Sequence, residues 1–110
     1  LFLAANGHAG QDQAEAEAVR RVFGPALPPA VALKGALGET YHAHGALAAV
    51  VALACLEQKT LPPTAHLADP GLAQALNLSA KSRPLDGKVA VLLAMDQDQK
   101  AAAIALGAAR

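Results

Sequence analysis

One stretch of this sequence limits what the chain can fold into: a central apolar segment that has no polar face. The interval from Tyr41 to Gln58 has helical character, and the run from Ala46 to Leu56 within it contains no charged residue. A helix that is apolar on every side is stable only where other structure covers it all round. A chain of 110 residues can hardly surround a helix of this length. The sequence therefore predicts packing against a further body of structure.

The composition supports this expectation. Hydrophobic residues make up 54% of the chain and charged residues 16%, which is too apolar for a disordered segment. However, 29 residues are alanine and only 3% are aromatic. Each buried CH₂ contributes only about 0.8 kcal/mol, so a core of alanines is marginal alone. Leu1 leads directly into the apolar residues Phe2 to Ala5. Such a start fits a segment of a longer protein or an ordinary chain boundary.

Charge and cysteine content exclude several classes of function. Nine basic and nine acidic residues give a net charge of zero, whereas a nucleic-acid binder needs a basic patch. No stretch approaches the roughly 20 apolar residues of a membrane span. No basic region precedes the apolar start, so the N-terminus is not a signal peptide. One cysteine cannot form an internal disulfide, which fits a reducing compartment. We expect a cytoplasmic protein with no nucleic-acid partner and no membrane span.

The pattern along the chain predicts one α/β domain over residues 1–110 with the element order β-α-β-α-β-β. A strand over 1–5 leads to a helix that Asp12 caps, with Glu15 completing a capping box, and that ends at Gly24 and Pro25. The other elements are expected as a strand over 30–33, a loop over 34–38, a helix over 41–58, an extended connection over 62–71, and two strands over 89–95 and 101–106 around a polar turn.

Three features of the middle of the chain resemble one enzyme family. Lys34 to Glu39 is followed by Gly45-Ala46 and, after the long helix, by Pro62-Pro63-Thr64. This frame resembles the lysine loop TKSxxGHxxGAAG and the PPT-x-N-L-x-x-P connection of the β-ketoacyl synthases. The resemblance is continuous from Lys34 to Pro70.

The flanking segments carry the same resemblance. Asn6-Gly7, Asp12, Glu15 and the segment ending in Phe23-Gly24 are similar to the family's HGTGT…D..E..A…VFG segment, with about two residues deleted. The two last strands occupy the place of the SNSFGFGGTN hairpin. The resemblance thus covers nearly the whole chain and implies the C-terminal half of a thiolase-like layered fold, which would pack against an N-terminal half.

The resemblance also implies a chemistry. The family forms carbon–carbon bonds in fatty-acid and polyketide synthesis, and it needs no cofactor and no metal. A cysteine in the N-terminal half takes the acyl chain as a thioester. Two histidines stabilise the enolate that forms when malonyl-carrier protein loses carbon dioxide, and a lysine supports one of them.

The family's catalytic positions are only partly kept here. Lys34 occupies the lysine position, but Asn6 and Glu39 occupy the positions of the two histidines. An asparagine can donate a hydrogen bond but carries no positive charge. A carboxylate at the second position would repel an enolate. We expect these replacements to remove the family's electrostatic stabilisation of the enolate.

The glycine-rich turn of the family is also replaced. Its GFGG residues fall on Asp96-Gln97-Asp98-Gln99, whose side chains would fill the space that glycine leaves open. Asp96 and Asp98 together could hold a cation, but a solvated hairpin turn is the simpler interpretation.

Other reactive side chains have plain structural interpretations. Cys55 lies inside the apolar helix, so we expect a packing residue and not a reactive thiolate. His42 and His44 are two residues apart on a helix and point to different faces, so with His8 they make a poor metal site. Asn6-Gly7 with Gly10 lacks the glycine spacing and the lysine of a phosphate loop.

Three functional hypotheses follow. The first is a catalytically altered ketosynthase-like subunit or fragment, of the chain-length-factor type. Its partners would be a ketosynthase-like subunit, as homo- or heterodimer, and an acyl carrier protein. The second is a divergent β-ketoacyl synthase, an acyltransferase that uses Lys34 with Asn6 or Glu39 and whose nucleophile lies in an N-terminal part. The third is a decayed remnant with no present function.

Overall fold

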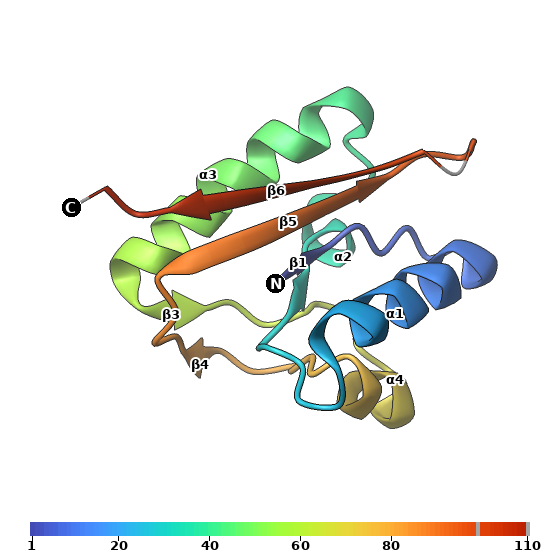
Figure 1. Cartoon of the computed structure of the whole chain (residues 1–110), viewed down its shortest axis with the longest axis horizontal. Coiled ribbons are helices and arrows are strands. Elements are labelled where there is room, and N and C mark those ends of the chain that lie inside the picture. Colours follow the sequence, from blue (N-terminus) through green and yellow to red (C-terminus); the bar gives the residue numbers. More distant parts are fainter. Residues whose placement is uncertain (99, 110) are drawn as a thin grey trace.

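The computed structural model describes residues 1–98 and 100–109 (Figure 1). In chain order its elements are β1 (Phe2–Leu3), α1 (Ala9–Phe23), β2 (Val31–Ala32), α2 (Lys34–Leu37), the 3₁₀ helix η1 (Tyr41–Ala43), α3 (His44–Gln58), β3 (Thr60–Leu61), α4 (Pro70–Ala75), β4 (Arg83–Pro84), β5 (Val89–Met95) and β6 (Ala101–Gly107). The expected α/β class is confirmed. The order β-α-β-α-β-β is that of β1, α1, β2, α3, β5 and β6, and short elements lie between them.

Two helices sandwich a mixed sheet. Its strand order is β2-β1-β5-β6, where β1 runs parallel to β2 and β5, and β6 runs antiparallel to β5. Successive strand residues point to opposite faces. Accordingly Phe2 packs with α3 residues in one core cluster, whereas Leu3 packs with α1 residues in another. The result is three layers, with α1 and α3 on opposite faces of the sheet (Figure 1).

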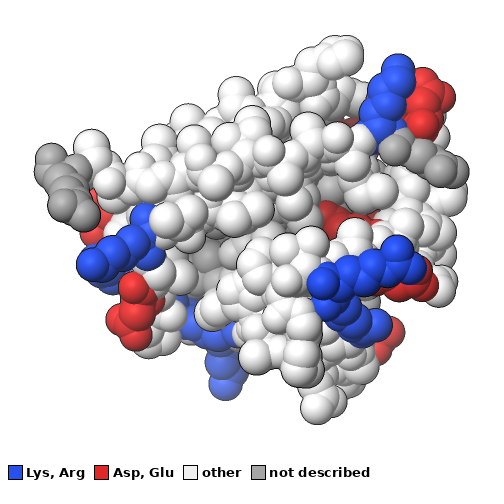
Figure 2. All heavy atoms as spheres, viewed as in Figure 1, with Lys and Arg blue, Asp and Glu red and all other residues white. Residues whose placement is uncertain are grey.

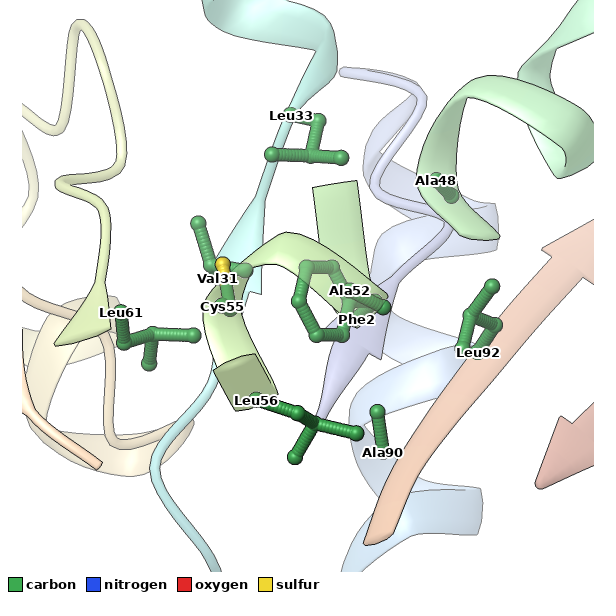
Figure 3. Packing of buried hydrophobic residues seen from close by; sticks show 10 residues of the cluster. All are labelled: Phe2, Val31, Leu33, Ala48, Ala52, Cys55, Leu56, Leu61, Ala90 and Leu92. Atoms are coloured by element: carbon green, nitrogen blue, oxygen red, sulfur yellow. The ribbon is translucent and has the colours of Figure 1, made fainter. Parts of the chain in front are cut away.

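The core on the α3 side is small and rich in alanine (Figure 3). Phe2 is its largest side chain and lies between α3 and β5. The labelled members are Phe2, Val31, Leu33, Ala48, Ala52, Cys55, Leu56, Leu61, Ala90 and Leu92. Because Ala48 and Ala52 bring the α3 backbone close to the strands, the helix buries little area per residue there.

One side of α3 is open within the part of the chain that the structure describes. Leu47, Val50 and Leu53 are 39%, 67% and 44% exposed. Over α3, β5 and β6 the surface in Figure 2 carries no charge, and charged side chains lie at its ends and below it. The described residues therefore leave one side of the helix uncovered. This agrees with the expectation that a chain of this length cannot surround it.

The predicted start of α1 is wrong. His8 is the N-cap residue and makes no side-chain capping hydrogen bond, and the helix already includes Ala9 and Gly10. Asp12 and Glu15 are thus inside the helix. Both turn back towards the segment between β1 and α1, where their carboxylates bind backbone N–H groups that no strand partner satisfies.

Two other segments differ from the prediction. Residues 34–37 form the short helix α2 and not a loop. The predicted connection over 62–71 ends at Asp69, where α4 begins. Asp69 is the N-cap residue and accepts hydrogen bonds from Gly71 N at 2.8 Å and Leu72 N at 3.2 Å. Pro70 at the first helical position is already set for a helix, so Asp69-Pro70 starts one.

The C-terminal hairpin is confirmed. β5 and β6 pair from Val89 opposite Gly107 to Met95 opposite Ala101. Asp96 N donates to Lys100 O at 3.0 Å and closes the turn. Of the predicted turn residues, Gln99 lies outside the described residues.

Candidate functional site

The three residues predicted from the sequence meet at one edge of the sheet. Asn6 follows β1 and Lys34 follows β2. These strands are parallel and adjacent, so their carboxyl ends lie side by side, which is where open α/β sheets bind ligands. Glu39 comes after α2, which turns the chain back over the same edge. Topology therefore joins residues that are 33 positions apart.

Lys34 is held between the other two. Its Nζ donates a short hydrogen bond to Asn6 Oδ1 and lies 3.0 Å from Glu39 Oε2. The Lys34 side chain is 13% exposed and that of Glu39 is 40% exposed. The hydrogen bond from Lys34 lowers the pKa of Glu39, and the backbone N–H of Tyr41, at 2.9 Å from Oε1, lowers it further. Glu39 is therefore ionised at neutral pH and compensates the lysine.

Two carboxylates of α1 hold the turn that carries Asn6. Glu15 accepts from the backbone N of Ala4 at 2.6 Å and of Ala5 at 2.9 Å. Asp12 accepts from the N of Asn6 at 2.9 Å and from the next residue, Gly7, at 3.1 Å. Four successive backbone donors are thus bound by side chains. Ala5 has φ 35°, a conformation unusual for alanine, which these bonds stabilise.

This role of Asp12 and Glu15 differs from the predicted one. The prediction was a capping box, in which the side chains would serve the helix that they start. The signal that points to the observed role is their i, i+3 spacing behind an Asn-Gly turn, which places both carboxylates on the helix face towards that turn.

Glu15 is a buried acid. It is 3% exposed, and burial raises its pKa above the ordinary value, while the two backbone hydrogen bonds act in the opposite direction. The raised pKa reflects a carboxylate that has lost more solvation than its hydrogen bonds restore.

The two neighbouring histidines have different surroundings. His42 is exposed, whereas His44, the first residue of α3, is 8% exposed. Burial lowers the pKa of His44, and the positive charge of Lys34 lowers it further. Within residues 1–98 and 100–109, no group of three or more His, Cys, Asp or Glu side chains is arranged to hold a metal ion.

A cavity of about 390 Å³ opens beside the lysine. Asn6, Lys34 and Glu39 line it together with leucines from β1, from the 64–67 segment, from α4 and from the residues that follow α4. These leucines are Leu3, Leu67, Leu72, Leu76 and Leu78. Gly35 also lines it, and a Cβ at this position would lie 2.7 Å from the carbonyl oxygen of Ala65. The absence of a side chain at Gly35 is therefore what lets α2 approach the 64–67 segment.

Comparison with known families covers the same residues. The family model for the β-ketoacyl synthase C-terminal domain matches residues 2–68, which include Asn6, Lys34 and Glu39. The chain belongs to this family. A search of the curated proteins found no match for it.

The match ends before the last third of this ketoacyl synthase domain. Residues after 68 nevertheless complete the same sheet, because Leu92 of β5 pairs with Phe2 of β1. The hairpin of β5 and β6 is thus an integral part of the structure. No helix in the described part of this domain is long and apolar enough to cross a membrane.

The ketoacyl synthase domain has few groups near Lys34 that could stabilise an anion. Asn6 donates from Nδ2 to Gln11 Oε1 at 2.8 Å, and its Oδ1 accepts from the lysine. The lysine charge is compensated by Glu39 at 3.0 Å. The carboxylates of Asp12 and Glu15 also line the cavity. The electrostatics of this arrangement favour neutral groups over anions.

Cys55 is placed as the sequence predicts, inside α3. It is 6% exposed in the core cluster around Phe2, and burial raises its pKa. It does not line the cavity. A buried thiol with a raised pKa is a poor nucleophile, because the thiolate is the reactive form.

Proposed function

We propose that this ketoacyl synthase domain is catalytically altered and serves as the partner of an active ketosynthase in fatty-acid or polyketide biosynthesis. The observation that carries the proposal is the contact of Lys34 with Glu39 and Asn6 at the two positions where the family has histidines. The lysine that would support an enolate is here engaged by a carboxylate.

The expected loss of catalysis is large. Removing a single donor that stabilises a developing oxyanion typically costs about 2.7–4 kcal/mol, or 10²–10³ in rate. Glu39, at 3.0 Å, also compensates the positive charge of Lys34, so the lysine attracts an enolate less strongly. Both changes act against decarboxylation of malonyl-carrier protein, so we expect no turnover from this domain alone.

The open side of α3 supports the pairing. Leu47, Val50 and Leu53 form an apolar strip on a helix that is otherwise packed against the sheet. Apolar surface of this kind marks contact with further protein. The body that covers it in the proposal is a ketosynthase-like subunit, with the acyl carrier protein delivering the chain to that subunit, as in a chain-length factor.

Carbon dioxide release from malonyl-carrier protein tests the catalytic part. The protein is assayed with any residues that flank these 110 in the natural protein, with an active ketosynthase as the positive control. The proposal expects no release above background. Release at the rate of the control would favour the alternative, a divergent synthase that uses Lys34 with Asn6 or Glu39 and a cysteine elsewhere.

Two variants designed to restore activity make this assay a test of Glu39 itself. The double variant Asn6→His with Glu39→His places imidazoles at both positions and frees Lys34, so decarboxylation should rise. Asn6→His alone leaves Glu39 on Lys34 and should not respond. Equal rates for the two variants would contradict the role given to Glu39.

A further inference from the structure

Asn6 and Gly7 form an Asn-Gly pair between β1 and α1. Asparagine is a thermolabile residue, because the backbone nitrogen of the next residue can attack its side-chain carbon and release ammonia. Glycine in the next position leaves this attack sterically open, since it has no Cβ. Gly7 is exposed, with φ 75°, and a Cβ there would meet nothing within 4 Å among the described residues. The pair therefore has the sequence and the free space that deamidation requires.

The nitrogen that would attack is bound to a base. Gly7 N donates to Asp12 Oδ2 at 3.1 Å. This separation lies within the roughly 2.6–3.2 Å over which a general base takes up a proton. An amide nitrogen becomes a nucleophile only as its proton leaves, so the carboxylate of Asp12 activates it. The other oxygen of Asp12 accepts from Asn6 N at 2.9 Å, which holds the carboxylate against the turn.

The carbonyl that would be attacked is polarised by a cation. Lys34 Nζ donates to Asn6 Oδ1. Attack at Cγ places negative charge on this oxygen, and a donor that is already directed at such an oxyanion lowers the barrier. Asn6 Nδ2 donates to Gln11 Oε1 at 2.8 Å. The amide is thus held with its oxygen on the lysine and its leaving nitrogen on a separate partner.

We propose that Asn6 is a site of self-catalysed deamidation. Asp12 takes the proton of Gly7 N, this nitrogen forms a bond to Asn6 Cγ, and negative charge collects on Oδ1 beside Lys34. Asp12 then gives the proton to Nδ2, the Cγ–Nδ2 bond breaks, and ammonia leaves. A water molecule opens the resulting succinimide at either of its two carbonyls, which gives aspartate or isoaspartate at position 6.

The modification changes the charge of the site. A neutral amide at position 6 becomes a carboxylate beside Lys34, which already lies 3.0 Å from Glu39. Isoaspartate also adds one CH₂ to a backbone segment whose four successive N–H groups are bound by side chains. This inference goes beyond the proposed function and does not depend on it. A chain that does not deamidate could still pair with an active ketosynthase, and a chain that fails to pair could still deamidate.

Asn77 is a matched control within the same chain. Its Oδ1 accepts from Arg83 Nη1 at 2.8 Å, so this amide is also polarised by a cation. However, the next residue is Leu78, whose N donates to the carbonyl oxygen of Ala73 at 2.8 Å. A carbonyl oxygen cannot take the proton as a carboxylate does. Asn77 should therefore stay intact where Asn6 reacts.

Mass spectrometry of proteolytic peptides measures the reaction. The protein, with its natural flanking residues, is incubated at neutral pH either folded or unfolded in guanidinium chloride. The readouts are the mass gain when NH₂ becomes OH and labelling by protein isoaspartate methyltransferase. Isoaspartate reports the succinimide, because direct hydrolysis of the amide gives only aspartate.

The comparison of folded and unfolded protein tests whether the fold promotes the reaction. A single donor to an oxyanion is typically worth about 10²–10³ in rate, so we expect Asn6 to react at least about tenfold faster in the folded protein. Asn77 should remain unmodified there. A rate at Asn6 that is equal or slower in the folded protein would overturn the proposal.

Two variants test the two catalytic groups. Asp12→Asn keeps an acceptor for Gly7 N but cannot take its proton, and Lys34→Met removes the donor to Oδ1. Each should slow isoaspartate formation at least about tenfold in the folded protein. Glu17→Gln, at an exposed acid of the same helix, should not. An unchanged rate in either variant, or an equal loss in Glu17→Gln, contradicts the mechanism. If circular dichroism shows that a variant is unfolded, the folded and unfolded rates of the wild type decide.

Discussion

At the scale of residues, carboxylates hold the backbone and the lysine in place at the site. Glu39 binds Lys34, and Asp12 and Glu15 bind the N–H groups of residues 4–7. Asn6 therefore has a fixed position, because the two carboxylates bind four successive backbone N–H groups of its segment. The consequence is a lysine that is paired with a carboxylate at the edge of the sheet.

Glu15→Gln tests the buried acid. The amide has one acceptor oxygen where the carboxylate has two, so one of the N–H groups of Ala4 and Ala5 loses its partner. A buried donor without a partner costs about 1–3 kcal/mol. We expect a loss of this size in the free energy of unfolding, measured in urea at pH 7. Glu15→Asp, which keeps the charge but is shorter, is the matched variant.

The same residue gives a pH dependence with a defined sign. The pKa of Glu15 is raised in the folded state, so the folded protein binds this proton more tightly than the unfolded chain does. Its contribution to stability is therefore present at low pH and falls as pH rises from the ordinary pKa of 4.5 to the raised pKa. In urea titrations from pH 4 to 7, the stability of the wild type relative to Glu15→Gln should fall as pH rises. Parallel curves for the two proteins would contradict it.

His44 acts in the opposite sense. Its pKa is lowered, first by burial and then by Lys34, with Glu39 opposing. The folded state thus favours neutral imidazole, and stability is lost as pH falls through the ordinary value of 6.5 towards the lowered pKa. His44→Phe should remove this part of the acid sensitivity. ¹⁵N NMR titration of the imidazole checks the lowered midpoint directly.

At the scale of elements, the short segments decide where the site residues stand. α2 places Glu39 over Lys34, and α4 supplies leucines to the cavity wall. These elements have only four and six residues, so neither would be stable as an isolated helix. α2 is held by its close approach to the carbonyl oxygen of Ala65, and α4 by the cap at Asp69.

Gly35 in α2 provides a test of that contact. A methyl group there would approach the Ala65 carbonyl oxygen to 2.7 Å, so Gly35→Ala should destabilise the fold by about 1–3 kcal/mol. Gly45→Ala is the control, because a Cβ at Gly45 meets nothing within 4 Å and removing a helical glycine favours folding by about 0.5–1 kcal/mol. Thermal melts of the two variants should shift in opposite directions.

At the scale of the whole molecule, two surfaces are not covered by any of the described residues: the open side of α3 and the outer edge of β6. Leu47, Val50 and Leu53 make the first surface apolar, and the second contains no charged residue. An alanine-rich core with one phenylalanine cannot offset such exposure by a large surplus of buried area. We expect the fold to gain stability when these surfaces are covered.

Val50→Glu tests the α3 surface. Val50 is 67% exposed, so the charge should leave the fold intact but prevent an apolar contact. Val22→Glu, at a residue of α1 that is 76% exposed, is the matched control. In size-exclusion chromatography with an active ketosynthase, Val50→Glu should lose the complex and Val22→Glu should keep it. Loss in both, or in neither, would reject this surface as the contact.

Much of the architecture follows from sequence alone. The helix over 41–58 and the hairpin strands were predicted within a few residues, because long apolar runs and a polar turn leave few alternatives. The family could be predicted because its motifs keep their order and spacing along the sequence, and the match to the family model confirms it. The identities at positions 6, 34 and 39 are likewise a property of the sequence.

The contacts of those residues follow from tertiary packing. The use of Asp12 and Glu15 depends on where the strand ends relative to α1. The short helix α2 depends on its close approach to Ala65, and α4 begins at the cap formed by Asp69. The contact of Lys34 with Glu39 and the free edge of β6 both depend on the pairing of strands distant in the chain. Local sequence carries periodicity and capping, but contacts between distant segments are set by packing, which no local pattern records.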